Sequence, residues 1–168
     1  MPEEVSYEIG DREIDGDDYF PVIEPAYWSV SIYDGPERYD DDLKRFSEEQ
    51  RLVLAYHWYL SEVYNGGHEQ FFYNSTGLVW ADARKVFAEI GITEVVDIID
   101  EAGSRLGGCP SLDTEERQLQ LDLMNPDFQD LDNKLFAFID AVDIDKMIKA
   151  FIRSHRDKFY FSGIVKKL

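Results

Sequence analysis

Apolar residues recur along most of the chain at the three- and four-residue spacing of amphipathic helices. Glycine, proline and Asn-Pro pairs interrupt this pattern, which predicts short loops between the helical runs. The pattern therefore predicts an all-α fold, a compact bundle of six to eight helices. We expect the helices at about 26–33, 41–64, 79–90, 94–106, 114–124, 127–140 and 143–158.

The longest run, about 41–64, is apolar on two faces. Ser47 and Gln50 have the spacing of a capping box and give the run its strongest start signal. Leu54 and Trp58 lie four residues apart on the face opposite the main apolar stripe. A helix of this kind crosses the middle of a core or contacts a second subunit. A central position and a homodimer through Leu54 and Trp58 both remain open. The main stripe consists of Leu52, Val53, Tyr56, Tyr59, Leu60 and Val63.

The first 24 residues differ from the rest because they are acidic and spaced by glycines. Val5, Tyr7 and Ile9 alternate with polar residues, which permits a short strand. A lone hairpin would be only marginally stable. We therefore expect residues 1–24 to form an acidic extension that is either loosely ordered or draped on the body, and residues 25–168 to form a single all-α domain.

The charge of the chain is large and uneven. The 35 acidic and 17 basic residues give a net charge of −18. Residues 1–50 hold 16 acids and 4 bases, whereas residues 146–168 hold 1 acid and 7 bases. A charge this far from zero repels nucleic acid and favours basic partners. We expect an acidic body with a basic terminal helix. We also expect that the protein binds no nucleic acid directly.

Cysteine usage and hydropathy indicate the compartment. Cys109 is the one cysteine, so no intramolecular disulfide can form, as is usual in a reducing cytoplasm. The N-terminal residues have neither a basic segment nor an apolar run typical of a secretory signal. No apolar stretch approaches the roughly 20 residues that span a membrane. We expect a cytoplasmic protein without a membrane partner.

No catalytic or metal-binding constellation stands out. His68-Glu69 begins like a zinc-protease motif, but Phe72 occupies the position of the second histidine. His57 and His155 fall on other predicted elements and have no ligand spacing relative to His68. Cys109 lies between glycine and proline without a histidine nearby in sequence, which is typical of a loop thiol. We therefore expect no enzyme activity, no cofactor and no metal site.

The stretch 65–77, NGGHEQFFYNSTG, is the least generic part of the chain. Two adjacent glycines after a helical run predict a helix C-cap. Residues 70–73 are too few for an independent helix, so we expect a buried turn held by its neighbours. Its positions Asn65, Gly66, Gly67, Gln70, Phe71, Phe72, Asn74 and Gly77 are candidates for an architectural corner. In this corner Phe71 and Phe72 would anchor the core, and Gln70 and Asn74 would bind free backbone groups at the two helix ends.

This stretch resembles the NGG-x-x-QFF-x-N-x-x-G signature of the bacterial DNA-mimic protein family of the "DNA mimic protein nineteen" type. The resemblance extends to Phe128, Leu131 and Asp132 and to the helix from Ile148 to His155, over about residues 25–160. Asp132 lies at the flank of an apolar helix face, so we expect it to have a polar partner. The resemblance implies an all-α acidic dimer that occupies the DNA-binding surface of a helix-turn-helix transcription factor.

The implied function has a physical basis. DNA-binding proteins gain much of their affinity from Lys and Arg placed to meet phosphates. A folded surface with carboxylates at similar spacing can occupy the same site, and we expect its partner to be a basic DNA-binding protein. The same electrostatics would serve an immunity-type inhibitor of a basic nuclease or toxin. A small enzyme or ligand-binding domain that uses the glycine-rich turn is a third alternative. The candidate partner-binding acids are Asp40, Asp41, Asp42, Glu48, Glu49, Glu94, Asp97, Asp100 and Glu101.

Overall fold

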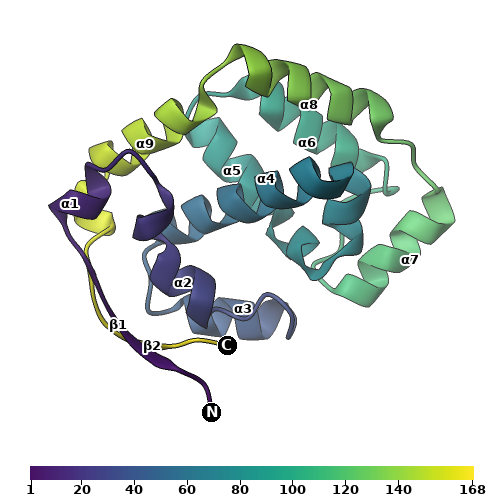
Figure 1. The fold of residues 1–168 in the computed structure, drawn as a ribbon. Helices are drawn as coiled ribbons and strands as arrows, with labels where there is room; N and C mark the ends of the chain where they lie inside the picture. Colours follow the sequence, from purple (N-terminus) through teal and green to yellow (C-terminus); the bar gives the residue numbers. More distant parts are fainter.

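The computed structural model describes all 168 residues as a mainly helical fold with one small sheet (Figure 1). Nine α-helices surround a single core, and the two strands lie at the ends of the chain. In chain order the elements are β1 (Glu4–Ile9), α1 (Asp11–Ile14), η1 (Phe20–Val22), α2 (Glu24–Ser29), α3 (Pro36–Leu43), α4 (Glu48–Tyr73), η2 (Ser75–Val79), α5 (Trp80–Glu89), α6 (Thr93–Ser104), α7 (Thr114–Met124), α8 (Gln129–Ala141), α9 (Ile144–Ser154), η3 (Arg156–Lys158) and β2 (Phe161–Lys166).

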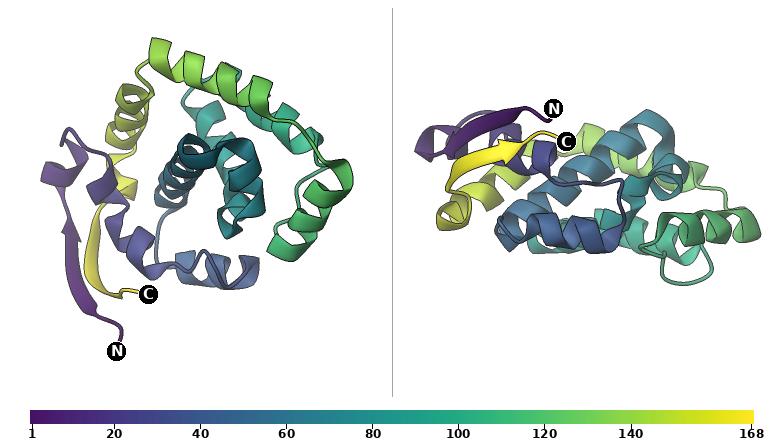
Figure 2. Two further views of the ribbon diagram at one scale, coloured as in Figure 1. Left: turned by 45° about the vertical axis from the view of Figure 1, so that its right-hand side comes forward. Right: turned by 90° about the horizontal axis from the view of Figure 1, so that it is seen from below.

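Helix α4 is the centre of the molecule. It packs against α2, α5, α7 and α8, and the left view of Figure 2 shows it inside a ring formed by the other helices. Leu54 is 0% exposed within the single chain, and the Trp58 ring stacks on Tyr27 with centroids 5.0 Å apart. The second apolar face thus belongs to the core, as the central-position alternative predicted. Leu54 is not available for a homodimer contact.

The start of α4 confirms the predicted capping box. The Ser47 hydroxyl accepts from the Gln50 backbone N–H at 3.1 Å, and the Gln50 side chain accepts from the Ser47 N–H at 3.0 Å. The predicted range of 41–64 was wrong at both ends. Residues 36–43 form the separate helix α3, which begins at Pro36 after Gly35 with a φ of 89°. At the other end, α4 continues through a kink to Tyr73.

The remaining predicted helices are present, α7 with the predicted bounds of 114–124 and α2, α5, α6, α8 and α9 with shifted bounds. The Asp113 side chain caps α7 by accepting from the Glu116 N–H at 2.9 Å, as its spacing predicted. The predicted cap at Thr93 was wrong, because Thr93 is already the first residue of α6 and no side chain caps that end. None of the helices is both long and apolar enough to cross a membrane.

Residues 1–24 do not form a separate acidic extension, because part of this segment pairs with β2 and part is buried in the core. Strand β1 pairs antiparallel with β2, with Val5 opposite Val165. Ile9 and Ile14 are buried in the same 39-residue cluster as the helices. The prediction of a purely helical fold missed β2, because its partner strand lies at the other end of the chain. The strand predicted at Val5–Ile9 therefore does not form a lone hairpin. It forms a two-stranded sheet with β2, and its last residue, Ile9, is buried in the core.

The basic C-terminal residues hold this N-terminal segment in place. Arg156 bonds to the carboxylates of Asp11 at 2.6 Å and Asp15 at 2.5 Å. On α9, Lys149 donates to the Asp17 carbonyl oxygen at 2.8 Å, and Arg153 donates to backbone carbonyls of the same loop. The positive charge that sequence assigns to residues 146–168 is therefore partly neutralised inside the molecule.

Replacing Arg156 with methionine is expected to loosen the N-terminal segment without unfolding the core. Both ion pairs are exposed, and such pairs contribute little to global stability. Amide hydrogen exchange should become faster in β1 and α1, whereas the urea midpoint should barely change. Lys158→Met is the matched control, since Lys158 is exposed and makes no ion pair or side-chain hydrogen bond. Equal exchange rates in the two variants would show that Arg156 does not hold the segment.

Candidate functional site

The NGG stretch forms a kink inside α4 rather than its end. Gly66 and Gly67 have non-helical backbone angles, and Gly67 has a φ of 70°. Helical structure resumes at once and continues to Tyr73, so the predicted C-cap and isolated turn were wrong in detail. Phe71 and Phe72 are both fully buried, which confirms their predicted role as core anchors.

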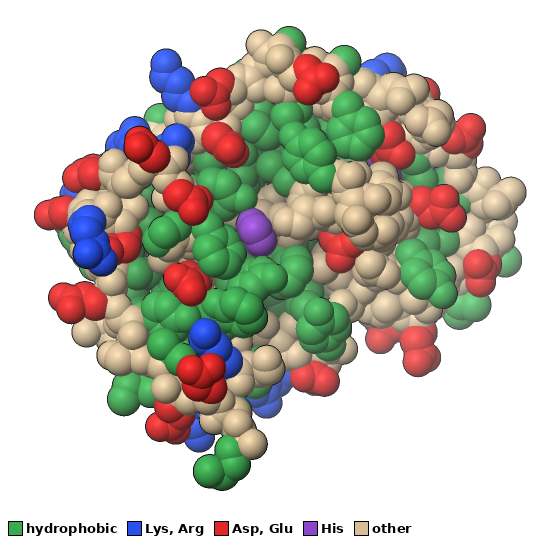
Figure 3. All heavy atoms as spheres, in the orientation of Figure 1, with side chains coloured by type: hydrophobic (Ala, Val, Ile, Leu, Met, Phe, Trp, Pro, Cys, Tyr) green, Lys and Arg blue, Asp and Glu red, His purple; other side chains and the backbone are tan.

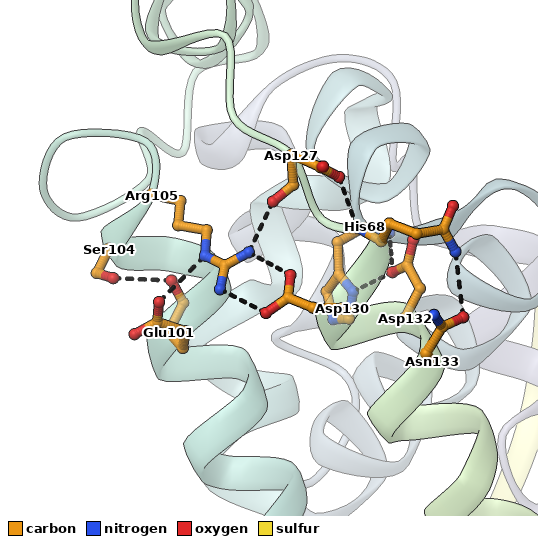
Figure 4. A network of polar contacts seen from close by, with 9 residues as sticks. His68, Glu101, Ser104, Arg105, Asp127, Asp130, Asp132 and Asn133 are labelled. Atoms are coloured by element: carbon orange, nitrogen blue, oxygen red, sulfur yellow. Dashed lines mark hydrogen bonds and ion pairs between the residues drawn. The ribbon is translucent and has the colours of Figure 1, made fainter.

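Asp132 of α8 fixes the chain just after the kink. Its Oδ1 accepts from the His68 backbone N–H at 3.0 Å and lies 2.5 Å from His68 Nδ1 (Figure 4). The His68 Nε2 lies 2.8 Å from the Tyr59 hydroxyl oxygen. Because a carboxylate only accepts, Nδ1 carries a proton, and in the neutral ring Nε2 accepts from Tyr59. The expected polar partner of Asp132 is therefore His68, which is 0% exposed.

Glu62 organises the second half of the corner. Its carboxylate accepts from the side chains of Gln70 at 2.7 Å, Asn74 at 3.1 Å and Thr76 at 2.9 Å. Gln70 and Asn74 thus bind a carboxylate, and the prediction that their side chains satisfy backbone groups at helix ends was wrong. Asn65 makes no side-chain hydrogen bond. Apart from Asn65, the amide side chains of the signature are therefore already engaged within the chain.

Arg117 of α7 is a structural residue that the sequence did not reveal. It is 0% exposed and donates to the backbone carbonyls of Phe72 at 2.7 Å, Asn74 at 2.6 Å and Ser111 at 2.7 Å. Burial lowers the pKa of Arg117 to about 10, so the guanidinium stays charged at neutral pH. A Cβ at Gly77 would lie 2.9 Å from the Arg117 Cζ, which explains the glycine at that position.

The candidate partner-binding acids divide into two groups. Six of the nine form ion pairs within the chain: Asp40 with Arg51, Asp41 with Lys44, Asp42 with Arg38, Glu48 with Lys85, Asp100 with Arg84 and Glu101 with Arg105. These cations offset the negative potential that the six carboxylates would present to a partner. Glu49, Glu94 and Asp97 have no such cation within 4.0 Å, and only the last two are fully on the surface.

Glu94 and Asp97 lie on the exposed side of α6, along a groove between α6 and α8. The groove has a volume of about 580 Å³, and Ile98, Leu131 and Phe138 line its apolar part. At its far end Arg105 forms a two-pronged pair with Asp130 at 2.6 and 2.8 Å (Figure 4). The hydrogen bonds from this guanidinium lower the pKa of Asp130 to about 2. Lys134 also lines the groove but forms no ion pair there, so the carboxylates without an ion pair lie at the N-terminal half of α6.

A second set of free carboxylates was missed by the sequence. Asp140, Asp143 and Asp145 surround the turn between α8 and α9, and none has a basic side chain within 4.0 Å. Phe138 lines the α6–α8 groove and its neighbour Ile139 lines the surface on the other side. The last turn of α8 therefore separates two acidic regions. Three aspartates within six residues were a visible signal, but only the fold shows that they surround one groove.

The other chemistry-bearing residues do not assemble into a site. Cys109 is exposed in the loop before α7 and has no histidine among its hydrogen-bond partners. His57 bonds to the Tyr19 hydroxyl, and His155 bonds to the Phe151 carbonyl one turn earlier. No three histidine, cysteine or acidic side chains are grouped as a metal ion would require.

Comparison with known proteins gives one match. A family model described as DMP19-like protein matches residues 44–155, which is two thirds of the chain. The matched region includes the kink at Gly66 and Gly67, its partner Asp132 and the acidic side of α6. No curated protein and no solved structure is significantly similar to the chain.

Proposed function

Because the chain belongs to the DMP19-like protein family, we propose that it is an acidic DNA mimic. In this proposal it binds a basic DNA-binding protein, such as a transcription factor in the cytoplasm, and inhibits it without catalysing a reaction. The observation that carries the proposal is the surplus of carboxylates without an internal cation. Fourteen of the 35 acidic residues lie within 4.0 Å of a basic group, which leaves 21 without one.

The position of Glu94 and Asp97 on a packed helix supports the same function. A mimic must hold its carboxylates at fixed positions, since a flexible acidic chain would lose entropy on binding. Glu94 and Asp97 lie on a regular helix, whose inner face is buried against α5 and α8. Residues three apart on a helix lie about 5–6 Å from one another. This spacing is close to that between successive phosphates of a strand.

Binding to the partner is expected to weaken steeply as salt rises. The partner would be captured from the native host on the immobilised protein, and its dissociation constant measured at several salt concentrations. Because affinity would come largely from charge, it should fall at least about tenfold between 50 and 200 mM salt. A tight complex whose affinity ignores salt would argue against mimicry.

Charge reversal locates the surface. Glu94→Lys with Asp97→Lys should weaken partner binding by more than about tenfold, because both changes place a positive charge against a basic surface. Neither carboxylate forms an ion pair whose loss would perturb the fold. Glu115→Lys with Asp122→Lys is the matched control, since these exposed acids of α7 also lack ion pairs. Equal weakening by both double variants would mean that net charge alone acts. Capture of a nuclease or toxin would instead favour the immunity-type alternative.

A further inference from the structure

A groove opens beside the second acidic region, where the middle of α4 faces the turn between α8 and α9. Its volume is about 640 Å³. The face drawn in Figure 3 shows apolar side chains gathered in a hollow, with carboxylates around it. The apolar lining consists of Tyr19, Leu60, Tyr64, Ile139, Ala141, Val142 and Ile144.

Tyr64 gives this groove an aromatic wall. Its ring is 55% exposed and stacks on Phe136 of α8, with centroids 5.9 Å apart and planes inclined by 22°. This contact with Phe136 limits the freedom of the Tyr64 ring before a ligand binds. Tyr19, on the opposite wall, is fixed by the hydrogen bond of 3.0 Å to His57. Both walls are therefore set before anything binds.

Three aspartates line the same groove. Asp143 is held by capping α9, where it accepts from the Lys146 N–H at 2.9 Å, and Asp145 accepts from the Tyr56 hydroxyl at 2.9 Å. Asp140 makes no side-chain hydrogen bond. Burial, and then the negative charges of Asp145 and Asp140, raise the pKa of Tyr64.

The nearby bases do not neutralise these aspartates. Lys149 of α9 is directed to the Asp17 carbonyl oxygen. Lys146 follows Asp145 directly in sequence but forms no ion pair with it. An apolar groove that carries three negative charges is complementary to a side chain with an apolar stem and a cationic end.

We propose that this groove binds an arginine side chain of the basic partner, with its stem against Leu60 and Tyr64 and its guanidinium on the aspartates. This proposal rests on the proposed function and adds a specific recognition pocket to it. Arginine fits better than lysine, because its planar guanidinium stacks on aromatic rings and bonds carboxylates through two donors at once. An arginine in a partly desolvated pocket beside a tyrosine also has the composition of an interface hot spot.

The test uses the full chain and a defined probe, the blocked pentapeptide acetyl-Ala-Ala-Arg-Ala-Ala-amide. Its citrulline counterpart keeps the shape of the side chain but lacks the charge. The peptides would be titrated into the isotopically labelled protein and followed by amide chemical shifts. The arginine peptide should shift residues 60–64 and 139–145, and the citrulline peptide should bind at least about tenfold more weakly.

Variants separate the groove from the overall charge. Asp140→Asn, Asp143→Asn and Asp145→Asn together should weaken arginine binding about tenfold, while asparagine can still cap α9 and accept from Tyr56. Tyr64→Ala should weaken it without changing the charge. The control combines Glu37→Gln, Glu115→Gln and Asp122→Asn, which remove three charges elsewhere and should leave binding unchanged. Equal losses in the two triple variants, or shifts confined to other surfaces, would overturn the proposal.

The same variants distinguish this inference from the proposed function. If the wild-type protein displaces DNA from the partner and the groove variant does so equally well, the groove proposal fails and mimicry stands. If the wild type displaces no DNA, mimicry fails whatever the peptide titration shows. If the groove variant loses both peptide binding and DNA displacement, both proposals are supported.

Discussion

Replacing Gly67 with alanine is expected to lower the free energy of unfolding by about 3 kcal/mol, one of the two largest effects in this protein. Gly67 has a φ of 70° and a ψ of −174°, a region essentially restricted to glycine that costs a residue with a Cβ on the order of 1–3 kcal/mol. In addition, the new Cβ would lie 2.9 Å from the Asp132 Cγ. The carboxylate that holds His68 would have to move away. Urea unfolding followed by circular dichroism would measure the loss.

Gly91→Ala separates the two causes. Gly91 has a similar φ of 78°, but no atom lies within 4 Å of the position of its Cβ. This variant should therefore lose only about 1–2 kcal/mol from backbone strain. Combining Gly67→Ala with Asp132→Ala should cost less than the sum of the single changes, because the second change removes the clash. Equal losses for Gly67→Ala and Gly91→Ala would contradict the account of the kink.

Arg117→Met is expected to destabilise the protein by about 3–5 kcal/mol. Methionine has a similar length but no donors, so the carbonyls of Phe72, Asn74 and Ser111 would be buried without a partner from this side chain. These carbonyls belong to the end of α4 and to the loop before α7. The loss should also be visible as faster amide exchange in both segments. Chemical denaturation and hydrogen exchange would measure the two effects.

The lysine variant at this position tests whether the donor fork matters. Arg117→Lys keeps the charge but cannot reach three separated carbonyls from one planar group. The free energy of unfolding of this variant should lie between those of the wild type and Arg117→Met. Arg45→Met is the surface control, since Arg45 is exposed and donates a single hydrogen bond, to the Ile164 carbonyl. If Arg117→Met unfolds at the same denaturant concentration as Arg45→Met, the buried guanidinium does not hold the two segments together.

Local signals in the sequence predicted much of the fold. Ser47 with Gln50 and Asp113 with Glu116 cap helices in the structure because a cap depends only on residues three apart. The aromatic pair Phe71 and Phe72 was identified as core because no exposed turn needs two such rings. The two apolar faces of α4 left a central position and a homodimer contact both open, and the packing of the folded chain decides for the central position.

Features that depend on distant residues could not be predicted. Strand β2 is stable only because β1, more than 150 residues earlier, pairs with it. Arg117 lies in a helix whose local sequence is as polar as that of any surface helix, so its burial was not visible. Glu62 likewise gave no sign that it would accept three side chains from the following turn.

The candidate partner-binding surface was predicted only in part, because it also depends on contacts between distant residues. The exposure of most acids follows from their place on a helix, and Glu94 and Asp97 are exposed as expected. Packing between helices decides which acids are neutralised by a nearby cation. Glu48 pairs with Lys85 and Asp100 pairs with Arg84, and each pair joins two different helices. The aspartates near the start of α9 became candidates only when the fold placed them around a groove.

Competition with DNA tests the central claim most directly. The captured partner would be bound to fluorescently labelled DNA, and the acidic protein titrated into the complex while anisotropy and native mass are recorded. Mimicry predicts complete release of the DNA, a binary protein–partner complex and no species that contains all three components. A stable ternary complex, with the DNA still bound at saturating protein, would contradict the account.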